Sequence, residues 1–126
     1  MANASLKATL TISSTDLLDS VNVSKTSSAT LTIDGDNRQG LTTIKTSTTF
    51  QNLTIENFSG AIKKAYLYVK NTDATDALIL ADDGGVTFAR LEPGEFCFYP
   101  SADNTTVQVK ASANTPGCEF FALEVL

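Results

Sequence analysis

The chain has 126 residues, of which 42% are hydrophobic and 18% are charged, and its formal net charge is −5. This length suits one domain with a single core and is too short for two. The acidic balance argues against a nucleic-acid partner, because neutralising phosphates requires clustered Lys and Arg. The sequence contains no His, which excludes His-based acid–base catalysis, Ser-His-Asp and Cys-His sites, and imidazole metal ligands.

The N-terminal part alternates between apolar and polar residues. In residues 6–12 and 29–33 every second position is apolar, which is typical of strands with one buried and one solvated face. Residues 13–20 carry a candidate N-cap and are the clearest helix candidate, although the segment is short. Residues 34–37, with their Asp and Gly, predict a turn. Residues 1–30 leave two alternatives open, an edge hairpin or an arm that orders only on contact.

The second half, residues 61–126, carries most of the aromatic residues and is predicted to be the better-packed part. Residues 107–111 alternate, whereas 77–81 and 120–126 are apolar on both faces. The latter two predict central strands covered on both sides, or strands that meet a second subunit.

Turn signals recur at the spacing of an antiparallel sandwich. They fall at residues 34–37, 57–60, 71–76, 82–85, 93–94, 100–104 and 114–117. We therefore predict an all-β fold, an antiparallel β-sandwich that is jelly-roll-like, with nine or ten short strands in a single domain over residues 1–126.

The start of the chain and its apolar runs predict neither a secretory signal nor a membrane span. Residues 1–7 lack a basic segment followed by a long apolar run, and runs such as 77–81 are too short to cross a bilayer. We expect a protein made in a cytoplasm, with no membrane partner. Cys97 and Cys118 are too few for a disulfide framework and are best interpreted as buried thiols, with a cross-strand bridge or a reactive thiol as alternatives.

Acidic residues near glycine offer two candidate sites, each with a simpler interpretation. Asp34-x-Asp36-Asn37 and Asp82-Asp83-Gly84 resemble fragments of calcium loops, but neither completes the EF-hand spacing, and hairpin turns are favoured. Glu92 and Glu95 flank Pro93-Gly94, which predicts a type II turn with solvated carboxylates rather than a catalytic pair. A similar Pro-Gly-Glu phrase occurs in cupins, whose metal sites need His. We predict no enzyme, no catalytic residue, no metal and no cofactor.

Aromatic residues gather on two predicted strands. Tyr66 and Tyr68 share one face, flanked by Lys64 and Lys70, and Phe96 and Phe98 share a face of another strand. Three interpretations remain open: the rim of a sandwich, a protein interface, and a carbohydrate-stacking platform. The absence of Trp weakens the third.

The order of elements over residues 60–126 resembles small β-sandwich or jelly-roll virion proteins of tailed bacteriophages. The resemblance is carried by a strand ending in Lys70-Asn71, by the turn in Leu91-Glu92-Pro93-Gly94-Glu95, and by the closing aromatic-rich strand of residues 119–125. The first sixty residues show no such likeness.

The resemblance implies a structural role in a virion, as a capsid decoration or cement protein or as a tail component. It also implies a homo-oligomer, for which trimers are usual in that class, bound to the major capsid protein or another virion protein. The expected packing or contact residues are Tyr66, Tyr68, Phe96, Phe98 and Phe120.

Overall fold

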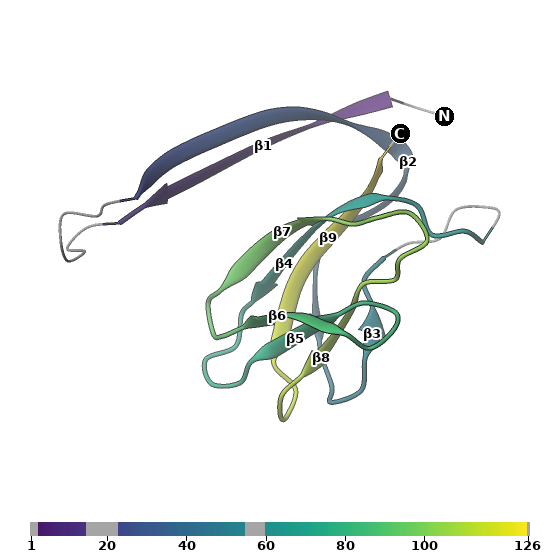
Figure 1. Cartoon of the computed structure of the whole chain (residues 1–126). Coiled ribbons are helices and arrows are strands. Elements are labelled where there is room, and N and C mark those ends of the chain that lie inside the picture. Colours follow the sequence, from purple (N-terminus) through teal and green to yellow (C-terminus); the bar gives the residue numbers. More distant parts are fainter. Residues whose placement is uncertain (1–2, 15–22, 55–59, 126) are drawn as a thin grey trace.

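The described part of the chain consists of nine β-strands joined by turns and loops (Figure 1). The computed structural model describes residues 3–14, 23–54 and 60–125. No helix occurs among these residues. The strands are β1 (Asn3–Ser13), β2 (Ser24–Lys45), β3 (Gln51–Asn52), β4 (Ala65–Asn71), β5 (Leu78–Ala81), β6 (Thr87–Leu91), β7 (Phe96–Pro100), β8 (Gln108–Ala111) and β9 (Gly117–Val125).

The strands form two antiparallel sheets that pack face to face. One sheet has the order β1-β2-β9-β4-β7 and the other the order β3-β8-β5-β6. With β1 set aside, the orders 2-9-4-7 and 3-8-5-6 are those of a jelly roll, an eight-stranded double sheet built from two Greek keys. The predicted all-β, jelly-roll-like sandwich is therefore confirmed.

The core lies between the two sheets and is built by alternation along each strand. In β4 and β9 every second residue is buried, so that one set of side chains faces the opposite sheet and the other faces outward. The buried cluster is formed by Leu53, Leu67, Val69, Leu78, Leu80, Leu91, Val107, Val109, Cys118, Phe120 and Ala122. All but Leu53 come from the second half of the chain, which confirms that this half is the better packed.

A two-stranded hairpin projects from the jelly roll (Figure 1). It consists of β1 and the first part of β2, paired from Asn3 opposite Asp34 to Ser13 opposite Ser24, and is called the arm below. The strands predicted in residues 6–12 and 29–33 are therefore confirmed. The predicted burial of their apolar face is wrong for β1, because Leu10 and Ile12 are 47% and 48% exposed. The alternation of apolar and polar residues shows that one face of the strand is apolar. It does not show whether another part of the protein covers that face.

Strand β2 continues from the arm into the jelly roll as one strand of 22 residues, so the strands are not all short. The turn predicted at residues 34–37 is wrong, because this segment lies inside β2. There the pairing with β9 shifts register between Ile33 and Arg38. Asp and Gly favour irregular backbone, and here that irregularity is a bulge in a strand instead of a turn between two. The helix considered for residues 13–20 begins at Ser13, the last residue of β1, and its residues 15–20 lie outside the described residues.

The turns predicted between β5 and β6 and between β6 and β7 are confirmed. Gly94 has a φ of 84°, and the backbone N–H of Glu95 donates to the carbonyl of Glu92 at 2.9 Å, as a type II turn requires. In the other turn the Asp82 carboxylate accepts from the backbone N–H groups of Gly84 and Val86 at 3.0 and 3.1 Å. Asp82 therefore serves a hairpin turn.

Candidate functional site

Five aromatic side chains gather on the outer surface of the larger sheet. They come from the three adjacent strands β4, β7 and β9, and they occupy the positions that alternate with the core residues. The register places Tyr68 between Phe98 of β7 and Phe121 of β9. We call this surface the aromatic face; it consists of Tyr66, Tyr68, Phe96, Phe98 and Phe121.

The rings of the aromatic face contact one another across the strands. Tyr66 stacks on Phe98 with a centroid distance of 5.8 Å, and Tyr68 stacks on Phe121 at 5.4 Å and meets Phe96 at 6.3 Å. Phe96 and Phe98 nevertheless remain 55% and 40% exposed. Scattered exposed hydrophobic residues are ordinary, whereas a contiguous cluster of them marks an interaction surface.

The five predicted packing or contact residues fall into two groups, four on one surface and one in the core. Tyr66, Tyr68, Phe96 and Phe98 lie on the aromatic face, whereas Phe120 is 7% exposed and packs in the core. Phe121 belongs to the face but was not predicted. Its place follows from alternation, because two adjacent residues of a strand point to opposite sides of the sheet.

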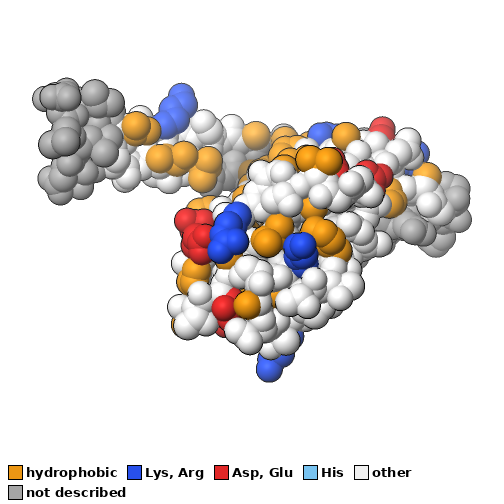
Figure 2. Space-filling model, turned by 60° about the horizontal axis from the view of Figure 1, so that its bottom comes forward, with side chains coloured by type: hydrophobic (Ala, Val, Ile, Leu, Met, Phe, Trp, Pro, Cys, Tyr) orange, Lys and Arg blue, Asp and Glu red, His pale blue; other side chains and the backbone are white. Residues whose placement is uncertain are grey.

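The arm overhangs the aromatic face and leaves an open slot of about 1230 Å³ between them. One wall of the slot is the arm, where the apolar Leu6, Leu10 and Ile12 alternate with polar residues, and the other wall is the aromatic face. Figure 2 shows hydrophobic side chains along the arm where it projects beyond the body of the molecule. We call this space the slot; both of its walls carry exposed apolar side chains, Leu10 and Ile12 on the arm and Phe96 and Phe98 on the aromatic face.

The described residues that line the slot include five titratable side chains. They are Lys7, Lys64, Tyr66, Tyr68 and Cys97, and none of these five is a carboxylate. The Tyr68 hydroxyl donates to the Glu119 carboxylate at 3.2 Å. Burial raises the pKa of Tyr68, and the hydrogen bond and the charge of Glu119 raise it further. This hydroxyl therefore stays protonated at neutral pH and provides no base.

Both cysteines are free thiols. Burial raises the pKa of Cys97, and burial together with the nearby Cys97 and Glu119 raises that of Cys118 to about 12. A protonated thiol is a poor nucleophile and a poor metal ligand. The two residues act as small apolar groups, with Cys118 in the core cluster and Cys97 packed against it.

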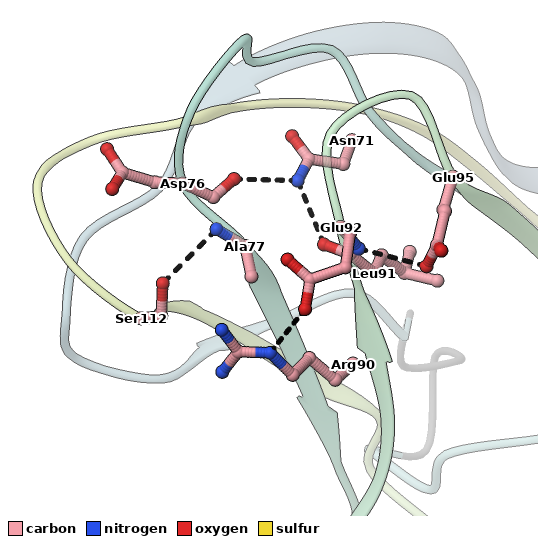
Figure 3. A network of polar contacts seen from close by, with 8 residues as sticks. All are labelled: Asn71, Asp76, Ala77, Arg90, Leu91, Glu92, Glu95 and Ser112. Carbon is pink, nitrogen blue, oxygen red and sulfur yellow. Dashed lines mark hydrogen bonds and ion pairs between the residues drawn. The ribbon is translucent and has the colours of Figure 1, made fainter.

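The carboxylates around the β6–β7 turn each have a local partner (Figure 3). Glu95 accepts from the backbone N–H of Glu92 at 3.0 Å, and Glu92 forms an exposed ion pair with Arg90 at 2.7 Å. They therefore serve the turn and the strand end. Within the described residues, no group of three or more His, Cys, Asp or Glu side chains is placed to hold a metal ion. No helix of that same part of the chain is long and apolar enough to cross a membrane.

Asn71 is a buried polar residue at the end of β4, and its contacts are structural (Figure 3). Its side-chain amide donates to the carbonyls of Asp76 and Leu91 at 2.8 and 2.9 Å, and its oxygen accepts from the backbone N–H of Asp73 at 2.9 Å. These bonds join the end of β4 to the end of β6 and to the loop before β5.

Comparison with known proteins returns no matching family model, no matching curated protein and no matching solved structure.

Proposed function

We propose that this chain is a non-enzymatic structural protein of a virion, a capsid decoration or cement protein that binds across capsomers and stabilises the shell. The observation that carries the proposal is the pair of uncovered apolar surfaces, the aromatic face and the apolar side of the arm, on one small jelly roll. The resemblance of residues 60–126 to phage virion proteins supports it.

The mechanism of such a protein is burial of surface area. A specific interface buries roughly 1,600 Å² in total, and aromatic residues are enriched at its centre. Many copies on one lattice add avidity, because each bound copy holds its neighbours close to their own sites. A homo-oligomer, of three copies as is usual in the class that the resemblance names, would multiply these contacts.

The test mixes the purified protein with capsids that lack it and measures binding and the melting temperature of the shell. We expect saturable binding and a higher melting temperature. Phe98→Ser should weaken binding at least tenfold, because it removes a central aromatic contact of the oligomer that binds the shell. Val86→Ser is the matched control, because Val86 is an exposed hydrophobic residue in the β5–β6 turn, outside the aromatic face. If the wild-type protein neither binds nor stabilises the shell, the cement function is wrong.

A second candidate function is a carbohydrate- or receptor-binding module, or another phage tail component. It is favoured by one observation, that aromatic side chains line a concave slot. It is opposed by the ring geometry, because Tyr68 already has Phe121 and Phe96 on either side, whereas sugars stack on free ring faces. Binding on a glycan array that is lost in Tyr66→Ala would favour this function, and labelling of tails instead of heads in electron micrographs would favour a tail component.

A further inference from the structure

The arm has one apolar face and one polar face. On β1 the apolar positions include Leu6, Leu10 and Ile12, and the register places Leu31 of β2 beside Leu6. On the other face Thr9 contacts Ser28 at 3.2 Å through their hydroxyls, and Thr11 and Thr26 lie opposite each other in the same way. Only the apolar face therefore gains by leaving water.

Among the described residues, no surface of the same chain fully covers the outer part of the arm, where Leu10 and Ile12 lie. A two-stranded hairpin is at best marginally stable in water unless its apolar face packs on something. The aromatic face lies across the open slot and leaves Leu10 and Ile12 about half exposed. The arm is also longer than that face, since 11 residues span about 36 Å and the 5 residues of β7 about 17 Å. It projects well beyond the strands that it overhangs (Figure 1).

The aromatic face also leaves apolar side chains exposed, because nothing covers Phe96 and Phe98 among the described residues. Each copy of the chain thus carries one apolar hairpin and one aromatic surface of the kind on which such a hairpin can pack. A second copy of the chain carries the same two surfaces. The arm of one copy can therefore cover the aromatic face of another copy, and no other protein is needed.

We propose that copies of this chain exchange arms: the apolar face of one copy's arm, centred on Leu10, packs on the aromatic face of a second copy around Phe98. This proposal deepens the homo-oligomer of the proposed function and rests on it for its place in the virion. Each copy gives one arm and receives one arm. Both a pair of copies and a closed ring meet this condition.

The available area agrees with two such contacts for each copy. A hairpin about 36 Å long and two strands, or about 10 Å, wide offers roughly 350 Å² on one face. One contact, counted on both partners, then buries about 700 Å², which is less than a stable specific interface needs. A pair of copies that exchange arms makes two such contacts and buries up to about 1,400 Å² in total, counted on both partners, which lies within the range of such interfaces.

The arm's attachment allows it to point at a neighbour. Strand β1 pairs with β2 alone, so the arm joins the jelly roll through β2. The register shift between Ile33 and Arg38 lies at the base of the arm. A change of direction at this bulge would leave the pairing of β2 with β9 in residues 38–45 intact.

The experiment measures mass in solution by sedimentation and uses two defective variants that complement each other. Leu10→Asp places a charge on the apolar face of the arm and leaves the aromatic face intact. Phe98→Ser removes an aromatic ring from the aromatic face and leaves the arm intact. We expect the wild-type protein to form an oligomer of two or more copies. The dissociation constant of each variant should be at least tenfold higher. An equimolar mixture should form mixed pairs more readily than either variant associates alone, although more weakly than the wild type, because the arm of the Phe98→Ser copy fits the face of the Leu10→Asp copy and one of the two contacts is intact. Formation of mixed pairs also shows that both variants are folded.

Matched controls separate this contact from a general loss of fold. Thr26→Asp introduces the same charge on the opposite face of the arm, outside the residues that line the slot, and Val86→Ser removes an exposed hydrophobic side chain from a turn away from the slot. Both should keep the wild-type mass.

Three outcomes would overturn arm exchange: a monomeric wild type, an oligomer that Phe98→Ser leaves unchanged, or a mixture of the two variants that associates no more strongly than either variant alone. The particle-binding assay distinguishes this failure from failure of the proposed function. A monomer that still binds capsids refutes arm exchange alone. An arm-exchanged oligomer that does not bind capsids refutes the cement function alone.

Discussion

The arm and the jelly roll share one sequence pattern but differ in what covers their apolar faces. In β4 of the jelly roll, Leu67 and Val69 are buried because the second sheet lies opposite them. In β1 of the arm, Leu10 and Ile12 alternate in the same way but face an open slot. The comparison shows that alternation specifies a strand with an apolar face, and that a second surface decides whether that face contributes to stability.

Truncating one leucine in each region should change the free energy of unfolding by very different amounts, and the loss in the jelly roll should exceed that of every other variant below. Leu80→Ala removes a fully buried side chain from β5, and we expect the free energy of unfolding to fall by about 2–5 kcal/mol. Leu10→Ala, tested in the Phe98→Ser background, should change it by less than about 0.5 kcal/mol, because the side chain is already half in water. Urea unfolding measures both values. Equal losses of unfolding free energy would show that Leu10 in the arm is packed as tightly as Leu80 in the core.

A smaller effect is expected at the polar anchor of the jelly roll. Asn71→Ala leaves the carbonyls of Asp76 and Leu91 and the backbone N–H of Asp73 without their partner, which should cost about 1–3 kcal/mol. Asn52→Ala is the control, because its contact with Gln108 is exposed. Urea unfolding should show little change in the control. A neutral Asn71→Ala would mean that water replaces these bonds.

The β6–β7 turn tests whether the jelly roll depends on a special backbone conformation. Gly94 has a φ of 84°, and Gly94→Ala should destabilise the protein by about 1–2 kcal/mol. At Gly40, inside β2, an added Cβ meets nothing within 4 Å and φ is not positive, so Gly40→Ala should be neutral within about 0.5 kcal/mol. Thermal melting compares the two variants. Equal effects would contradict a requirement for positive φ at position 94.

The smallest effect is a pH dependence in the loop before β5. Hydrogen bonds from the backbone of Asp76 and of Thr75 hold the pKa of Asp73 below its usual value of 3.8. Because the folded state favours the ionised carboxylate, its stabilising effect is present above pH 3.8 and is lost as the pH falls through the lower, folded pKa. The melting temperatures of the wild type and Asp73→Asn should therefore differ slightly at neutral pH and converge in strong acid. A difference that is constant with pH would be inconsistent with this.

Much of the architecture could be predicted from local patterns. Alternation in residues 6–12 and 107–111 predicted strands, and Pro93-Gly94 predicted its turn, because these signals depend on neighbours in the chain. The segment at residues 34–37 was misjudged for the same reason. Asp and Gly indicate irregular backbone, but whether the chain turns back or continues through a bulge depends on the pairing of β2 with β9.

The candidate site was predicted in part. The spacing of Tyr66 with Tyr68, and of Phe96 with Phe98, placed each pair on one face of its strand. Only the order β9-β4-β7 brought the pairs together and added Phe121 to them. Phe120, next to Phe121, faces the core instead, since adjacent strand residues point to opposite sides of a sheet.

Local sequence patterns were sufficient to predict antiparallel strands with at least one apolar face, because side-chain direction in a strand repeats every two residues. The composition also excluded imidazole chemistry, since the chain contains no His. Which of the apolar faces are covered depends on the packing of the whole chain. Covering a strand requires a second surface, and strand order and register bring that surface from elsewhere in the chain. In the jelly roll the second sheet provides this covering surface, whereas the outer part of the arm has none among the described residues.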